Sequence, residues 1–355
     1  IIGAPFKSDA AFFTGAAYVF DAVTGQQLFK FEDVDPEEND QFGTSVAVSG
    51  TIAVIGSPFN ADVAPQAGAV YVFDLTTGQQ LFKLTASDGT IGDRLGSSVA
   101  ISGTTIIAGA PRDNVTGAAS GSAYIFDAST GAQIWKIVPS DGRTNGWFGF
   151  SVAVDGTTAI VGSYDVTISG PDTGSAYVFR TTSGEHLYKL MPPQGGDIAQ
   201  FGSAVAISGS SAVVGSPGRN EVGQGSGAAF IYNAQTGDLT SMLRSSDLAS
   251  QDAFGGGVGI SGERNIVGAS GDDTQGDNTG AAYIFGGSPP CPGDIADDFG
   301  FAGADGQVGF GDFLAALAVL GPCPGGTPGC AFDIADDIGF EGADGQVSFG
   351  DFLFA

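Results

Sequence analysis

The stretch FGTSVAVSG, residues 42–50, recurs four more times in the chain and decides its fold. The later copies follow at equal steps of 53 residues and read LGSSVAISG (95–103), FGFSVAVDG (148–156), FGSAVAISG (201–209) and FGGGVGISG (254–262). Each copy alternates small or apolar residues with polar ones and contains glycine at its ends, a pattern that predicts a short β-strand. A strand that returns at a fixed period of this length indicates a repeat architecture.

Three further segments recur with the same period. In the second repeat they read AVIGSP (53–58), GAVYVFD (68–74) and QQLFKL (79–84), and the last follows a Thr-Gly turn. The alternation and the turn residues predict one strand in each segment. Each repeat therefore contains four short strands.

A single four-stranded sheet cannot bury both of its faces, and repeats of roughly 40 to 60 residues solve this by packing as blades around an axis. We therefore predict an all-β protein, a β-propeller of four-stranded blades with six repeats visible and six or seven blades in total. The FGTSVAVSG line is poor in bulky residues, so we place it nearest the crowded axis. The aromatic third and fourth lines suit the wider outer spaces.

The combination of FG at Phe42, IIGAP at Ile1 and GAAYVF at Gly15 resembles the FG-GAP repeat family of integrin-type propellers and exported bacterial proteins. The resemblance covers residues 1 to about 287 and implies a propeller with adhesive or scaffold roles. Some members hold calcium in a DxDxDG loop on the blades, and this loop is absent here. Asp272, Asp273 and Asp277 are the best blade candidates for calcium, but we favour a solvated loop for them.

Two series of polar residues recur just outside the strands. Residues of the first series precede the hairpin turn, where we expect them to form Asx-type turns: Asp21, Asp74, Asp127 and Asn233. Residues of the second series lie in the loop to the next blade, where we expect turn or inter-blade hydrogen bonds: Asp35, Asp88, Asp141 and Asp247, with Gln194 interrupting the series.

Both ends of the array lack a strand. The second and third segments occur six times, whereas the first and the fourth occur five times. Either the chain extends upstream of Ile1 or another molecule contributes a strand. Because open blade edges are templates for strand addition, we expect copies to associate head to tail, and contacts that do not close produce a filament.

The composition changes after the last repeat. From Ser288 onward there is no Lys, Arg or His, while eleven acidic residues occur. The stretch DIADDFGFAGADGQVGFGDFL (294–314) returns at 333–353, a step of 39 residues. We therefore divide the chain into a propeller, residues 1–287, and a small C-terminal domain of calcium loops and helices, residues 288–355.

The second half of each C-terminal copy has the spacing of positions 5, 6, 7, 8 and 12 of an EF-hand loop. Asp305 and Asp312 supply carboxylates, Gly306 permits the sharp turn, Gln307 offers its carbonyl, and Val308 anchors the loop. The first half of each copy departs from the plain DxDxD spacing, so its ligands are less defined. The full candidate set for Ca²⁺ is Asp294, Asp297, Asp298, Asp305, Gln307, Asp312, Asp333, Asp336, Asp337, Asp344, Gln346 and Asp351.

With aspartate as the last ligand and flanking GPCPGG, the tandem pair resembles the GC-type dockerin-like repeats. The resemblance implies a surface or anchoring element of exported proteins; a cohesin-binding face is not carried over. Cys291 and Cys330 occupy equivalent places, and Cys323 follows the first predicted helix. A Cys291–Cys323 disulfide would link one repeat and leave Cys330 without a partner, and a Cys323–Cys330 disulfide is the competing pairing.

Composition narrows the function. A net charge of −27 would repel nucleic acid, and no apolar run is long enough to span a bilayer. The sole His186 lies in a strand of the fourth line, and there is no GxSxG motif or recognisable acid pair. Late cysteines in Pro/Gly-rich contexts favour an oxidising compartment.

We therefore expect a secreted or cell-surface protein that is not an enzyme. It would be a calcium-stabilised structural subunit that forms homo-oligomers or polymers. The alternative is an adhesin or a propeller that binds a carbohydrate or a cell-surface protein, anchored through its dockerin-like module.

Overall fold

The computed structural model describes residues 1–8, 12–164, 174–193, 200–273 and 279–286, and within these ranges the chain forms β-strands and no helix. The strands form six antiparallel sheets, which we call blades 1 to 6 in chain order. The two end blades have three strands: β1 (Ile2–Ala4), β2 (Ala16–Phe20) and β3 (Gln27–Phe31) in blade 1, and β20 (Phe254–Ser261), β21 (Arg264–Ala269) and β22 (Ala281–Phe285) in blade 6.

The four middle blades have four strands each. Blade 2 contains β4 (Ser45–Ser49), β5 (Ile52–Ser57), β6 (Ala69–Asp74) and β7 (Gln80–Leu84). Blade 3 contains β8 (Ser98–Ser102), β9 (Thr105–Ala110), β10 (Ser122–Asp127) and β11 (Gln133–Ile137). Blade 4 contains β12 (Phe148–Asp155), β13 (Thr158–Ser163), β14 (Ser175–Arg180) and β15 (Glu185–Leu190). Blade 5 contains β16 (Val205–Ser208), β17 (Ser211–Ser216), β18 (Ala228–Asn233) and β19 (Leu239–Leu243).

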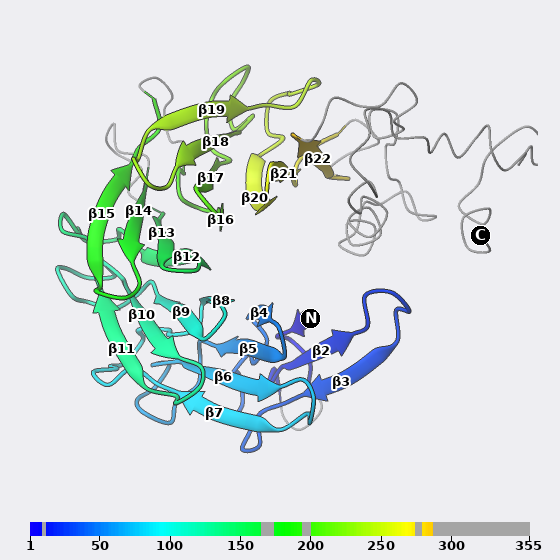
Figure 1. Cartoon of the computed structure of the whole chain (residues 1–355), viewed down its shortest axis with the longest axis vertical. Coiled ribbons are helices and arrows are strands. Elements are labelled where there is room, and N and C mark those ends of the chain that lie inside the picture. The colour runs from blue at the N-terminus through cyan, green and yellow to red at the C-terminus, as the bar shows by residue number, and fades with distance from the viewer. Residues whose placement is uncertain (9–11, 165–173, 194–199, 274–278, 287–355) are drawn as a thin grey trace, which may run out of the picture.

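The blades follow an arc around a common axis, with blades 1 and 6 at its two ends (Figure 1). In each middle blade the strand of the FGTSVAVSG line lies innermost and the strand of the QQLFKL line lies outermost, and sequence order equals spatial order. This confirms the predicted four-stranded blades and their orientation. The three-stranded end blades lack the inner strand in blade 1 and the outer strand in blade 6, as the repeat count predicts.

The FG pair connects each blade to the one before it. Phe148 is fully buried, and its ring packs edge to face against Tyr177 and Phe179, with centroids 5.5 and 5.8 Å apart. It also forms an isolated parallel bridge with Gly121 of blade 3. The same bridge recurs at all five junctions: Gly15 with Phe42, Gly68 with Leu95, Gly121 with Phe148, Gly174 with Phe201, and Gly227 with Phe254.

The glycine of the GAP line is required by a close backbone approach. A Cβ atom at Gly109 would lie 1.9 Å from the carbonyl oxygen of Gly149 in the next blade. Gly149 itself has a φ of +90°, a conformation that favours glycine. The two motifs that recur most clearly in the sequence are therefore the two sides of one inter-blade contact.

The hydrophobic core is divided among the junctions between consecutive blades, with one cluster at each of the five. At the junction of blades 2 and 3, Val54 and Val72 of one blade share a cluster with Tyr124 and Phe126 of the other. Full burial of such a side chain stabilises the fold by about 1.5–3 kcal/mol. Each middle blade therefore derives its stability from both neighbours.

Candidate functional site

The two end blades each expose a sheet face that is covered in the other blades. Phe20 in β2 is 37% exposed, whereas Phe73 at the equivalent position of blade 2 is 4% exposed. Ile284 in β22 is 40% exposed, whereas Ile125 of blade 3 is fully buried. These differences arise because blade 1 has no described blade before it and blade 6 has none after it.

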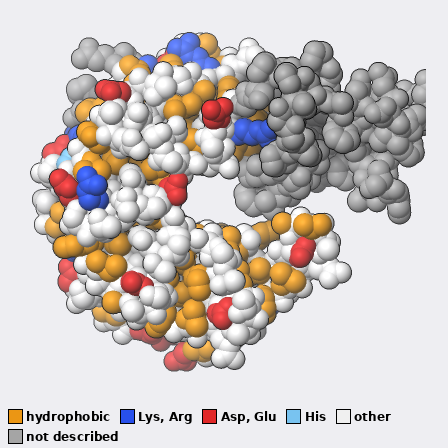
Figure 2. Space-filling view, in the orientation of Figure 1, with side chains coloured by type: hydrophobic (Ala, Val, Ile, Leu, Met, Phe, Trp, Pro, Cys, Tyr) orange, Lys and Arg blue, Asp and Glu red, His pale blue; other side chains and the backbone are white. Residues whose placement is uncertain are grey.

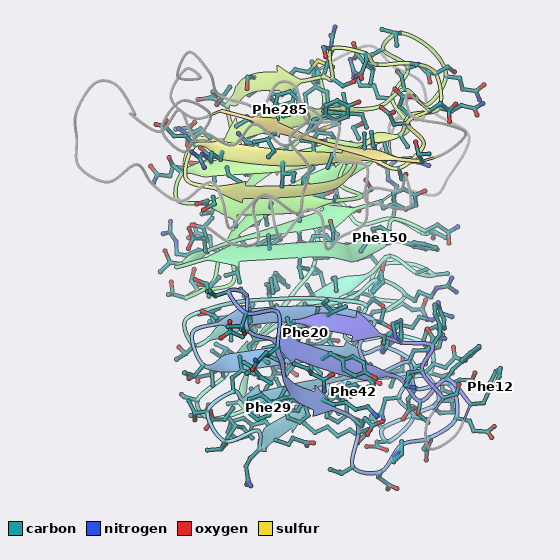
Figure 3. All side chains as sticks on the ribbon, turned by 90° about the vertical axis from the view of Figure 1, so that its right-hand side faces the viewer. Phe12, Phe20, Phe29, Phe42, Phe150 and Phe285 are labelled. Carbon is teal, nitrogen blue, oxygen red and sulfur yellow. The ribbon has the colours of Figure 1, made fainter. Side chains whose placement is uncertain are left out.

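We define the open face of blade 1 as Ile2, Tyr18 and Phe20, and the open face of blade 6 as Ile266, Ala282 and Ile284. Register places each set on one side of its sheet, because Ile2 pairs with Tyr18 and Ile266 pairs with Ile284. Hydrophobic atoms are visible along the part of blade 1 that borders the open side of the arc (Figure 2). Viewed from that side, Phe20 lies on the sheet of blade 1 (Figure 3).

The two open faces correspond to the two halves of a buried junction. Tyr18 and Phe20 occupy the places of Tyr124 and Phe126, which contact the preceding blade. Ile284 occupies the place of Val72, which contacts the following blade. The open faces therefore have the chemistry that the chain already pairs at its internal junctions.

A polar cluster recurs beside the strands, and we call it the tyrosine–lysine cluster. In blade 3 the hydroxyl of Tyr124 donates to Asp88 at 2.9 Å and to Asp113 at 3.2 Å. The Nζ atom of Lys136 lies 2.6 Å from Asp88 and 2.8 Å from Asp113, and 5.3 Å from the centroid of the Tyr124 ring. One lysine thus neutralises two carboxylates next to a buried phenol.

The electrostatics of this cluster follow from burial and pairing. Burial alone would lower the pKa of Lys136, but hydrogen bonds to Asp113 and Asp88 raise it above its usual value. Burial alone would raise the pKa of Asp88, but Lys136 and Tyr124 hold it below its usual value. Burial and the nearby Asp113 raise the pKa of Tyr124. All three groups keep their ordinary charge at neutral pH.

Blades 2 and 4 contain the same cluster. In blade 4, Asp141 accepts from Tyr177 at 2.8 Å and from Lys189 at 2.5 Å. In blade 2, Asp33 accepts from Tyr71 and lies 3.7 Å from Lys83. The four residues of the blade 2 cluster are Tyr71, Lys83, Asp33 and Asp62.

The predicted second series of aspartates is confirmed in three of four positions. Asp88, Asp141 and Asp247 each accept a hydrogen bond from a tyrosine of the next blade. The prediction for Asp35 is wrong, because Asp33 takes this role and Asp35 is exposed. The first of these two loops differs in shape, and period alone does not show which aspartate turns inward.

Blade 6 has the tyrosine and the aspartates of the cluster. Tyr283 donates to Asp247 at 2.8 Å and to Asp272 at 2.6 Å, the equivalents of Asp88 and Asp113. The expectation that Asp272 lies in a solvated loop is wrong, because its side chain is buried beside Tyr283. Asp277 lies outside the described residues.

The first series of turn residues is confirmed. Asp21 accepts hydrogen bonds from the backbone N–H groups of Val23 and Thr24, and Asn233 does so from Gln235 and Thr236. These backbone hydrogen bonds lower the pKa of Asp21. Asp74 and Asp127 form the same Asx turns.

An aromatic cluster occurs in blade 4 alone among the described repeats. Phe150 and Tyr164 stack with centroids 4.8 Å apart, and Trp147 lies 6.0 Å from Phe150. The guanidinium of Arg112 lies 5.1 Å from the centroid of Trp147. Phe150 is 36% exposed, so the cluster presents an aromatic surface to solvent (Figure 3).

His186 does not form part of a catalytic arrangement in the described structure. Its ring lies 5.6 Å from Tyr177 and 5.3 Å from Phe179, centroid to centroid, and Nε2 has no hydrogen-bond partner. Packing against aromatic rings agrees with the expectation from its place in a strand.

The candidate calcium ligands and the three cysteines lie outside the described residues. This applies to Asp294, Asp297, Asp298, Asp305, Gln307, Asp312, Asp333, Asp336, Asp337, Asp344, Gln346 and Asp351, and to Cys291, Cys323 and Cys330. Within the described ranges, no group of three or more His, Cys, Asp or Glu residues is arranged to hold a metal ion. The calcium site therefore stays a prediction from the sequence.

Sequence reasoning missed the lysines of the tyrosine–lysine clusters. The signal was present, because the tyrosine of the third segment and the lysine of the fourth both recur at 53-residue steps. Their contact becomes visible only when the register is known. In the part of the chain that the structure describes, no helix has the length and apolarity needed to cross a membrane.

Comparison with known families gives one match. The model described as FG-GAP repeat matches residues 26–73, 79–126, 132–179, 186–232 and 239–285, which together are more than half of the chain. Each match begins at a fourth strand and ends within the third strand of the next blade. No curated protein matches the chain.

Proposed function

Because the chain belongs to the FG-GAP repeat family, we propose that it is a secreted structural protein whose propeller blades join one copy to the next. FG-GAP repeats are typical of extracellular or cell-surface proteins. The observation that carries the proposal is the pair of open faces on blades 1 and 6. Their residues are the two halves of the junction that the chain forms five times internally.

The proposed contact is heterologous, since the open face of blade 1 packs on the open face of blade 6 of another copy. Such a contact makes a ring if its rotation closes and a filament if it does not. Apolar residues on both faces supply the driving force, because burial of apolar area favours association. We further propose that the protein has no enzymatic activity.

Charge substitutions on the open faces test the assembly. We expect Phe20→Asp and Ile284→Asp each to abolish self-association in analytical ultracentrifugation, because a carboxylate would be buried without a partner. Each variant retains one intact face, so an equimolar mixture is expected to form a dimer and no larger species. Leu81→Asp, at an exposed position of β7, controls for the added charge and should assemble like the wild type.

Two results would contradict this proposal. A wild-type chain that remains monomeric at all concentrations has no contact of this kind. A mixture of the two variants that gives only monomers shows that the faces do not bind one another.

We also propose that Ca²⁺ stabilises the C-terminal domain through the two EF-like half-loops at Asp305 and Asp344. The support is the ligand spacing and the absence of any cation among residues 288–355. Addition of EDTA is expected to lower the melting temperature and change the particle shape, and Ca²⁺ should restore both. An Asp305→Asn, Asp344→Asn variant should not respond to EDTA. If EDTA leaves the wild-type melting temperature and shape unchanged, the calcium proposal is wrong.

The aromatic cluster of blade 4 favours a second candidate function, the binding of a cell-surface glycan by an adhesin. Exposed aromatic rings can stack on the apolar faces of sugar rings, and Arg112 can donate hydrogen bonds to hydroxyl groups. In a Trp135→Phe background Trp147 is the only tryptophan, so its fluorescence reports on the cluster. We expect a shift with one class of soluble oligosaccharide that Phe150→Ala abolishes. Unchanged fluorescence across a broad oligosaccharide panel would exclude this function.

A further inference from the structure

The outer edge of β22 lacks the strand that completes every middle blade. In blades 2, 3, 4 and 5 the third strand pairs with an antiparallel fourth strand. In the described part of blade 6, β22 pairs with β21 only. An unpaired edge presents backbone N–H and C=O groups that can accept another strand.

The register shows which residue of the fourth strand lies opposite the tyrosine. In four blades this tyrosine pairs directly with a lysine: Tyr18 with Lys30, Tyr71 with Lys83, Tyr124 with Lys136, and Tyr177 with Lys189. In blade 5 a phenylalanine replaces the tyrosine and a methionine replaces the lysine, and Phe230 pairs with Met242. Tyrosine and lysine therefore occur together and are replaced together.

The chemistry explains this pairing. In blades 2, 3 and 4 the lysine contacts the aspartates that accept from the tyrosine or lie beside it, and its Nζ atom lies 5.0–5.3 Å from the ring centroid. A charge-assisted hydrogen bond and a cation–π contact both favour a cation at this point. Phe230 has no hydroxyl, and Arg219 replaces the aspartate of that blade, so a second cation there would be repelled.

Blade 6 has the tyrosine version of this site. Tyr283 donates to Asp247 and Asp272, the same pair of positions that Lys136 bridges in blade 3. We propose that the edge of β22 accepts an extended strand of another polypeptide, which places a lysine flanked by apolar residues opposite Tyr283. The expected register is that of blade 3, with an apolar residue opposite Ala282 and an aromatic residue opposite Ile284.

The composition of the chain points to a separate polypeptide as the source. Residues 287–355 contain no lysine, arginine or histidine. The lysine-bearing strands β3, β7, β11 and β15 are each paired within their own blades. This inference deepens the proposed assembly, since the added strand would complete the sheet next to the open face of blade 6. It does not depend on that assembly, because the site lies on a single chain.

A peptide titration tests the inference. The probe is a fluorescent peptide of residues 79–85, QQLFKLT, added to the full chain and followed by fluorescence anisotropy. We expect it to bind about tenfold more tightly than the same peptide with Lys83→Met, because the methionine cannot satisfy Asp247 and Asp272. N-methylation at alternate peptide nitrogens should abolish binding of both, since the edge contact needs the backbone donors.

Variants of the chain give the matched control. Tyr283→Phe reproduces the pair found in blade 5 and should reduce the preference for the lysine peptide to about twofold or less. Asp247→Asn should do the same, and circular dichroism checks that both variants fold. Equal binding of the two peptides to the wild-type chain, or no binding of either, would overturn the inference. A chain that stays monomeric yet prefers the lysine peptide would disprove the assembly alone.

Discussion

Replacement of Phe148 with alanine is expected to lower the free energy of unfolding by about 3–5 kcal/mol. The side chain is fully buried at the junction of blades 3 and 4, where it contacts two aromatic rings of its own blade. Its removal would leave a cavity that the rigid sheets on either side cannot fill by collapsing. Guanidinium unfolding followed by circular dichroism measures the loss.

Phe150→Ala is the matched control for this prediction. It removes the same side chain two residues later in β12, at a position that is partly exposed. We expect a loss of about 1 kcal/mol or less. Equal effects of the two substitutions would show that the FG phenylalanine does not hold the blades together.

The second large effect is expected for Gly109→Ala, which adds one methyl group. The added Cβ atom would lie 1.9 Å from the Gly149 carbonyl oxygen and 2.5 Å from the Ser98 hydroxyl. Because the nearest atom belongs to the backbone of the next blade, the two blades must move apart. We expect a loss of about 3 kcal/mol, measured as a lower midpoint of guanidinium unfolding.

Gly257→Ala makes the same chemical change at a place with room for it. No atom lies within 4 Å of the added Cβ, and the equivalent residues of blades 4 and 5 are Ser151 and Ala204. We expect a change within about 0.5 kcal/mol. If Gly109→Ala unfolds at the same midpoint as Gly257→Ala, the close approach does not fix the junction.

The sequence was sufficient to predict the blades because each repeat carries its own strand pattern and turn residues. The 53-residue period defined four strands per blade, and the lack of bulk in the FGTSVAVSG line placed it innermost, as the structure confirms. The count of segments also predicted which strand is missing at each end. These features depend on local pattern, which a single sequence contains in full.

Contacts that depend on register or loop shape were harder to predict. Tyr124 and Lys136 are twelve positions apart and lie opposite one another because a bulge near Phe126 shifts the pairing. The inward turn of Asp33 in place of Asp35 depends on the path of an irregular loop. The calcium loops and the closure of the propeller stay predictions, since the described residues do not test them.

The isolated bridges between each glycine and the phenylalanine of the next blade have a thermodynamic consequence. The bridges and the core clusters join only consecutive blades, so the stability of the array is approximately a sum of nearest-neighbour energies. A blade at either end has half the neighbours of a central one and should fray first. Duplication of one 53-residue unit adds one blade and one junction and leaves the existing junctions unchanged, so the length of such an array can change in evolution in single steps.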